Sequence, residues 1–296
     1  MLSWGIRSAW MPRSLKSDQG ISIKDRALLI PENERVLDPS AMPNRAIAPA
    51  WHTAVLMAGI LALSIAGKVQ VQGFHGRSNR LLTYGMTAGV ELLMLGWVAL
   101  GLWLRKVPLR TLFGTLQQGM RGFMLDFGVA ATFWIGSLVI LGTIGMLWTS
   151  AELSMDRSLH PKSAGRPADL SPKNKETLRA LEQLAPENGV ETGCWVLLCC
   201  VAGTIEELIF RGYLQSQFTA WTKGGVAWGV VLSALLFGAA HGYQGVRNMV
   251  LLAVFGALFS MLAIARRSLR AGMIAHGWHD LIAGLTLAFL RAHRLL

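Results

Sequence analysis

The most informative residues are ionisable side chains that interrupt long apolar stretches in the last third of the chain. Two adjacent glutamates end one stretch, a histidine ends the next, and a histidine and an aspartate one turn apart lie in the last; they are Glu206, Glu207, His241, His276 and Asp280. An ionisable group inside a bilayer is costly, so its presence there usually marks a functional site. Three such features on separate stretches predict one shared polar cavity between helices.

Helical spacing predicts which side chains share a face. Glu207 and Arg211 are four residues apart, so an α-helix places them where their charges neutralise one another. Glu206 is rotated by about 100° from Glu207 and needs another partner. Phe237 lies one turn before His241 on the same face. We therefore assign Glu207, Arg211 and Phe237 a supporting role.

Each of these features also has a purely structural explanation. The Glu-Glu-Arg group is typical of an interfacial ion pair, His241 of a head-group contact, and Asp280 of a packing contact with His276 or Arg270. Their coincidence on three separate stretches favours a functional site.

Three further residues are interpreted as structural. Glu91 is an isolated carboxylate deep in the second apolar stretch; its alternatives are to be protonated, to pair with Arg105 or Arg110, or to line the cavity. His279 and Trp278 face differently from the other polar residues of their stretch, and we expect them to pack or to contact the interface.

These residue types suit amide hydrolysis by an activated water. The reaction needs a base for the water and donors for the developing oxyanion, and Glu206, His241 and His276 supply both. Covalent catalysis is disfavoured, because Ser216 and Ser233 lack a Gly-x-Ser-x-Gly context and the three cysteines have no adjacent base.

Three motifs resemble, in order and spacing, those of the CAAX prenyl protease and bacteriocin-processing (CPBP) family of intramembrane proteases. They are Glu-Glu-x-x-x-Arg at 206–211, Phe-x-x-x-His at 237–241 and His-x-x-x-Asp at 276–280, within a region of roughly 192–290. The resemblance implies an intramembrane glutamic endopeptidase. Glu206 and His241 would activate the water, and His276 and Asp280 would hold the oxyanion.

The last motif position departs from the eukaryotic members, which typically have Asn where this chain has Asp280. An ionised carboxylate cannot donate a hydrogen bond, so Asp280 either is protonated and donates or orients His276. We favour the protonated donor, because the surrounding run is apolar. No cofactor is expected. The alternative is a zinc mechanism with His241, His276 and Glu206 or Glu207 as ligands, disfavoured because the chain has no His-Glu-x-x-His.

The composition predicts an all-α polytopic membrane protein. Of the 296 residues 52% are hydrophobic and 15% are charged, against about 25% charged in an average soluble domain. About seven stretches approach the ~20 residues that a transmembrane helix needs; they are 51–67, 82–104, 125–148, 192–210, 225–241, 249–265 and 271–290. The net charge is +11, and the 28 Lys and Arg residues fall mainly between and before these stretches. We therefore expect membrane lipids and a peptide or lipidated-protein substrate as partners, and no nucleic acid.

The chain is predicted to have three parts. Residues 1–50 form a flexible polar segment, 51–191 hold the first spans and a long polar loop, and 192–296 form the catalytic bundle. Apolar spacing predicts an interfacial amphipathic helix over 105–124 and a second one after Ser171. We expect the protein in a bacterial inner membrane, and the distribution of Lys and Arg favours a cytoplasmic amino terminus.

Two other classes of function are alternatives. A non-catalytic scaffold or immunity-type membrane protein would keep the fold without cleaving a substrate, and the intact Glu206, His241 and His276 disfavour it. A proton-coupled transporter would use the same buried carboxylates, but no sequence repeat or symmetry-related broken span supports it.

Overall fold

The computed structural model describes residues 45–73, 79–116, 119–159, 181–182 and 184–295. Every regular element in these residues is a helix, and six helical segments are long and apolar enough to cross a membrane. They are Ala50–Gly67, Arg80–Leu104, Gly119–Met155, Gly189–Trp221, Val246–Arg266 and Arg270–Ala292. The predicted all-α polytopic bundle is confirmed, and the protein is an integral membrane protein.

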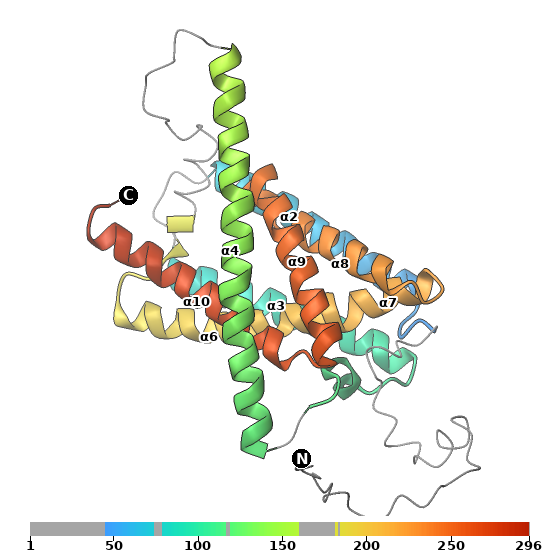
Figure 1. Cartoon of the computed structure of the whole chain (residues 1–296). Helices are drawn as coiled ribbons and strands as arrows, with labels where there is room; N and C mark the ends of the chain where they lie inside the picture. The colour runs from blue at the N-terminus through green and yellow to red at the C-terminus, as the bar shows by residue number, and fades with distance from the viewer. Residues whose placement is uncertain (1–44, 74–78, 117–118, 160–180, 183, 296) are drawn as a thin grey trace, which may run out of the picture. The chain divides into compact units, whose positions relative to one another are not determined.

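The helices follow the predicted apolar stretches closely (Figure 1). They are α2 (Ala50–Gly73), α3 (Arg80–Leu104), α4 (Gly119–Leu159), α6 (Gly189–Glu206), α7 (Gln215–Trp221), α8 (Val226–Ala240), α9 (Val246–Arg266) and α10 (Arg270–Ala292). The fifth predicted span, α8, has 15 residues, and at 1.5 Å per residue it is about 22 Å long, short of the ~30 Å hydrocarbon core. The seven expected spans are therefore six, with one shorter apolar helix.

A π-helical segment joins α6 to α7 and begins inside the first sequence motif. This segment, η4 (Glu207–Leu214), directly follows Glu206, and all eight of its residues are buried. α3, α6, α8 and α9 all pack against it. π-Helices are rare and often occur at functional sites, because their wider turn redirects side chains. The sequence had predicted a regular α-helix through this motif.

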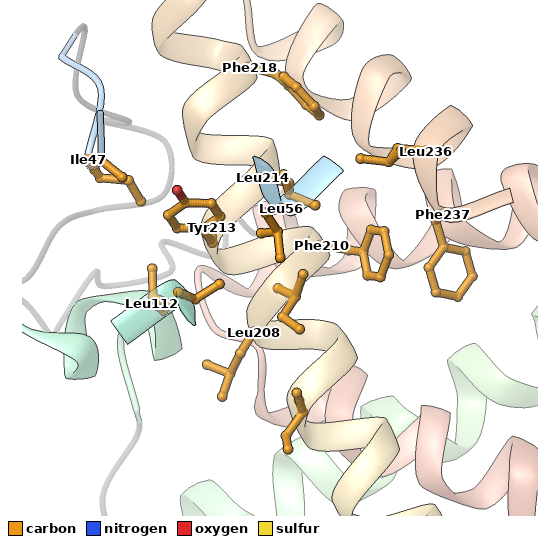
Figure 2. Close-up of a cluster of buried hydrophobic side chains, with 14 of the residues drawn as sticks. Ile47, Leu56, Leu112, Leu208, Phe210, Tyr213, Leu214, Phe218, Leu236 and Phe237 are labelled. Atoms are coloured by element: carbon orange, nitrogen blue, oxygen red, sulfur yellow. The ribbon is translucent and has the colours of Figure 1, made fainter. Parts of the chain in front are cut away.

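The largest apolar core surrounds η4 (Figure 2). It includes side chains from the segment before α2, from α2, and from η4, α7 and α8. The rings of Phe210 and Phe237 pack edge to face, with 5.0 Å between their centres. A second cluster, of Ala130, Phe255, Phe259 and Ala275, joins α4 to α9 and α10. Together the two clusters include residues of every motif-bearing element: α6, η4, α8 and α10.

The interfacial helix predicted over 105–124 is wrong. Among the described residues 105–116 only Leu109–Phe113 is helical, as the short 3₁₀ segment η2, and residues 119–124 belong to α4. Gly114 has a left-handed backbone, with φ of 71°, and the next N–H, of Thr115, donates to the Arg267 carbonyl at 2.7 Å. The backbone therefore pairs with the turn between α9 and α10, which overrides the local apolar spacing.

The last residues of the range 1–50, predicted to be flexible, are held against α7. Ile47 and Ala48 are buried, and both of their N–H groups donate to the Gln217 side-chain oxygen, at 2.8 and 3.3 Å. A polar group in α7 thus attaches the chain before α2. The rest of the tail lies outside the described residues, as does most of the amphipathic helix predicted after Ser171.

Candidate active site

Two glycines bring α6 and α10 into backbone contact beside the predicted site. A Cβ atom built on Gly203 would lie 2.7 Å from the backbone nitrogen of Gly277, and one on Gly277 would lie 3.3 Å from the Cys199 carbonyl oxygen. Small residues at helix crossings allow this approach in membrane proteins. Gly277 adjoins His276, and Gly203 precedes Glu206 by three residues, so the crossing sets the separation of the two motifs.

Glu207 is buried and contacts both Arg211 and His276. Its Oε1 lies 3.0 Å from Arg211 Nη1 and 3.0 Å from His276 Nδ1, and the Glu207 and Arg211 side chains are each 1% exposed. The pair with Arg211 is the contact that the sequence spacing predicted. The hydrogen bond with His276 was not predicted, and it fixes the orientation of the imidazole ring.

The Arg211 guanidinium is enclosed by aromatic rings. Its central carbon lies 4.3 Å from the centre of the Phe237 ring and 5.1 Å from that of Phe259, and Nη2 donates to the Gly256 carbonyl at 3.4 Å. Cation–π contacts and the Glu207 carboxylate compensate the removal of this charge from water. Arg211 therefore supports the site from within the core.

Three carboxyl groups surround the His276 ring. Beside the Glu207 contact at Nδ1, the second nitrogen, Nε2, lies 3.7 Å from Glu206 Oε2 and 3.8 Å from Asp280 Oδ2. The Glu206 and Asp280 side chains are 16% and 32% exposed. The structure thus brings the first and third motifs together and supplies the partner that the spacing had required for Glu206.

His241 ends α8 beside this cluster. Its Nδ1 lies 2.8 Å from the Phe237 carbonyl oxygen, so a proton on Nδ1 makes that hydrogen bond and leaves Nε2 as an acceptor. The Phe237 ring is 4.9 Å from the His241 ring and 6.0 Å from the His276 ring, centre to centre. Phe237 therefore packs against both histidines, and Asp280 is electrostatically coupled to each of them.

Sequence reasoning missed Tyr243, which lies in the 3₁₀ segment η5 (Gly242–Gln244) between α8 and α9. Its ring centre is 6.1 Å from that of His241, its hydroxyl accepts from the Gln244 amide at 3.0 Å, and Glu206 and Asp280 are among its electrostatic neighbours. Burial raises the pKa of Tyr243, so the phenol keeps its proton and remains a hydrogen-bond donor. Its position two residues after His241 was the available signal.

Glu91 also lies at this site, although its sequence context had favoured a structural role. It is 7% exposed, and its charged neighbours are Glu206, His276 and Asp280. His279 and Trp278 do pack, as expected: their rings contact Phe255 and Phe127, with 4.7 Å between ring centres in each pair.

The residues proposed as zinc ligands do not form a ligand set as they are placed. In the part of the chain that the structure describes, no group of three or more His, Cys, Asp or Glu side chains is arranged to hold a metal ion. Glu207 is already engaged by Arg211 and His276.

An open cavity of about 670 Å³ lies between the start of α6 and the end of α10, where Asn188 and Arg291 are among its lining residues. Glu206 ends the same 18-residue helix, about 27 Å away at 1.5 Å per residue. The cavity is therefore separate from the acid–base cluster.

Residues 189–282 match the sequence model of the family described as type II CAAX prenyl endopeptidase Rce1-like. The matched segment runs from the start of α6 into α10 and contains all three motifs. No curated protein and no solved structure matches the chain. The match agrees with the resemblance inferred from the motifs: residues 189–282 of this integral membrane protein are similar in sequence to the Rce1-like type II CAAX prenyl endopeptidases.

Proposed function

We propose that this protein is an intramembrane endopeptidase in which Glu206 and His241 activate a water for attack on a peptide bond. The observation that carries the proposal is the convergence of Glu206, Glu207 and Asp280 on the single imidazole of His276. The proposed base, Glu206, and the proposed charged donor, His276, thereby meet beside the crossing of α6 and α10, and His241 packs on the same Phe237 ring as His276. Amide hydrolysis without a covalent intermediate needs these groups.

In the proposed reaction Glu206 takes a proton from the water, and the resulting hydroxide forms a bond to the scissile carbonyl carbon. His241, with Nδ1 bonded to the Phe237 carbonyl, accepts from the water at Nε2 and orients it. When the carbon–nitrogen bond breaks, the proton held by Glu206 passes to the leaving amine. The carboxylate is thereby regenerated.

His276 is proposed to hold the oxyanion. With a carboxylate facing each ring nitrogen, both nitrogens carry protons most favourably, and Nε2–H becomes a charged donor. Glu207 holds the ring from Nδ1, and this hydrogen bond fixes the orientation of the imidazole. Asp280 is proposed to assist as a neutral donor.

The substrate is proposed to be a peptide or lipidated protein that reaches the site from the membrane. Large apolar side chains on the outer faces of the spans, such as Leu93 at 74% exposure, fit contact with lipid chains. For the orientation we propose a cytoplasmic amino terminus in a bacterial inner membrane, on the distribution of Lys and Arg.

The test compares Glu206→Gln and His241→Ala with the wild type, using a quenched peptide with a prenylated carboxyl-terminal segment in detergent or liposomes. We expect both variants to lose activity to background while their melting temperatures stay close to that of the wild type. Glu152→Gln and His293→Ala are matched controls, because both residues are exposed and lie outside the site. Full activity in purified Glu206→Gln would overturn the proposal and favour another base or a non-catalytic role.

A further inference from the structure

Glu91 is positioned to act on Glu206 from a helix that carries none of the three motifs. α3 turns one narrow stripe toward the protein, in which Tyr84, Glu91 and Val98 are buried at intervals of seven residues. Most of the neighbouring side chains on α3 face outward. α3 packs along α6 and η4, so the stripe leads to the site and places the carboxyl group of Glu91 inside the bundle.

The contacts of Glu91 are unusual for a carboxyl group. It makes a side-chain hydrogen bond with Glu206, and its other charged neighbours are His276 and Asp280. Oε2 of Glu91 and Oε2 of Glu206 are both buried and have no donor among the described residues. A hydrogen bond between two carboxyl groups requires a proton between them, because an ionised carboxylate only accepts.

We propose that Glu91 is a positioning residue for the reaction, and that its neutral carboxyl group donates a hydrogen bond that holds the Glu206 carboxylate facing His276 and the attacking water. The inference rests on the proposed function. One Glu206 oxygen accepts from Glu91, and the other remains free to take the proton of the water. The proton of Glu91 is not consumed, so the reaction balances without it.

The competing explanation is that Glu91 only joins α3 to α6. Both accounts predict a contribution to stability, but they differ in the kinetics. A residue that orients the base affects the chemical step, so its loss should lower kcat with little change in KM. Loss of a residue that only holds two helices together should lower stability. It should lower activity only in proportion to the folded fraction.

The experiment measures kcat, KM and melting temperature for Glu91→Gln and Glu91→Leu. Gln keeps an N–H donor at nearly the same place, so we expect activity within a few-fold of the wild type. Leu has a similar volume but no donor, and we expect kcat to fall about 10- to 100-fold, the cost of a misplaced catalytic group, with KM within about threefold. Tyr84→Phe is the matched control on the same buried stripe, and it should keep wild-type kinetics.

Wild-type kcat in folded Glu91→Leu would overturn the inference, as would a Gln variant as inactive as the Leu variant. Infrared spectra supply a measurement that needs neither activity nor the Leu variant. We expect a protonated-carboxyl stretch in the wild type that disappears in Glu91→Gln and shifts in Glu206→Gln; no change in either variant would contradict the proposal. Activity in Glu206→Gln would refute the proposed function, whereas inactive Glu206→Gln beside fully active Glu91→Leu would refute only the role of Glu91.

Discussion

Gly203 and Gly277 lie so close that a methyl group on Gly203 would stand 2.7 Å from the backbone nitrogen of Gly277. The contact is between two backbones, so no flexible side chain is available to move aside. The distance between Glu206 on α6 and His276 on α10, 3.7 Å between Oε2 and Nε2, depends on this approach. The geometry of the candidate site therefore depends on the absence of a side chain at both positions.

We predict that Gly203→Ala separates α6 from α10 and lowers both stability and activity. Overpacking of this kind costs about 1–3 kcal/mol, and a displacement of a few tenths of an ångström would weaken the Glu206–His276 contact. Gly193→Ala is the matched control, because it lies on the same helix with nothing within 4 Å of the added carbon. Melting temperature and kcat should fall in Gly203→Ala only, and equal behaviour of the two variants would contradict the prediction.

We predict that Glu207→Gln destabilises the protein and also impairs catalysis. The change leaves the buried Arg211 charge unpaired and removes the carboxylate from His276 Nδ1. Loss of one partner of a buried pair costs about 3–5 kcal/mol, which should appear as a large drop in melting temperature.

A double variant separates the two roles of Glu207. Arg211→Met added to Glu207→Gln removes the unpaired charge, so the melting temperature should recover in part while the activity stays low. If activity recovers together with stability, Glu207 acts only through the ion pair and not through His276.

We predict that a chelator strong enough to remove zinc leaves the activity intact. The base and the donors of the proposed reaction are side chains, and Glu207 is already bonded to Arg211 and His276. Peptidase assays with and without the chelator, together with metal analysis of the purified protein, check this. Stoichiometric zinc that is lost with the activity and restores it on addition would establish the metal mechanism instead.

We predict that Asp280→Asn retains much of the activity. Protonated Asp280 and Asn are both neutral donors, so the variant keeps an N–H donor at nearly the same place without a change of charge, and His276 still has Glu206 and Glu207 as carboxylate neighbours. The pH–rate profiles of the wild type and the variant, measured side by side, test this. Activity near background at every pH would show that Asp280 acts as a carboxylate that orients His276.

The sequence by itself determined the membrane class, most of the helices and the residues of the three motifs. Hydropathy and helical spacing are properties of one segment, so the spans and the pair of Glu207 with Arg211 could be predicted without knowledge of the rest of the chain. The resemblance to a protease family rested on the same local patterns, and the family match agrees with it.

Only the tertiary structure decided how these segments meet. The apolar spacing over 105–124 predicted a helix, but pairing of Thr115 with the Arg267 carbonyl satisfied the backbone in another way. Glu207 and His276 are 69 positions apart, and Glu91 is more distant still from Glu206, so no local pattern linked them. Their contacts depend on the close approach of α6 and α10 and on the packing of α3, because the neighbours of a buried charge come from other helices.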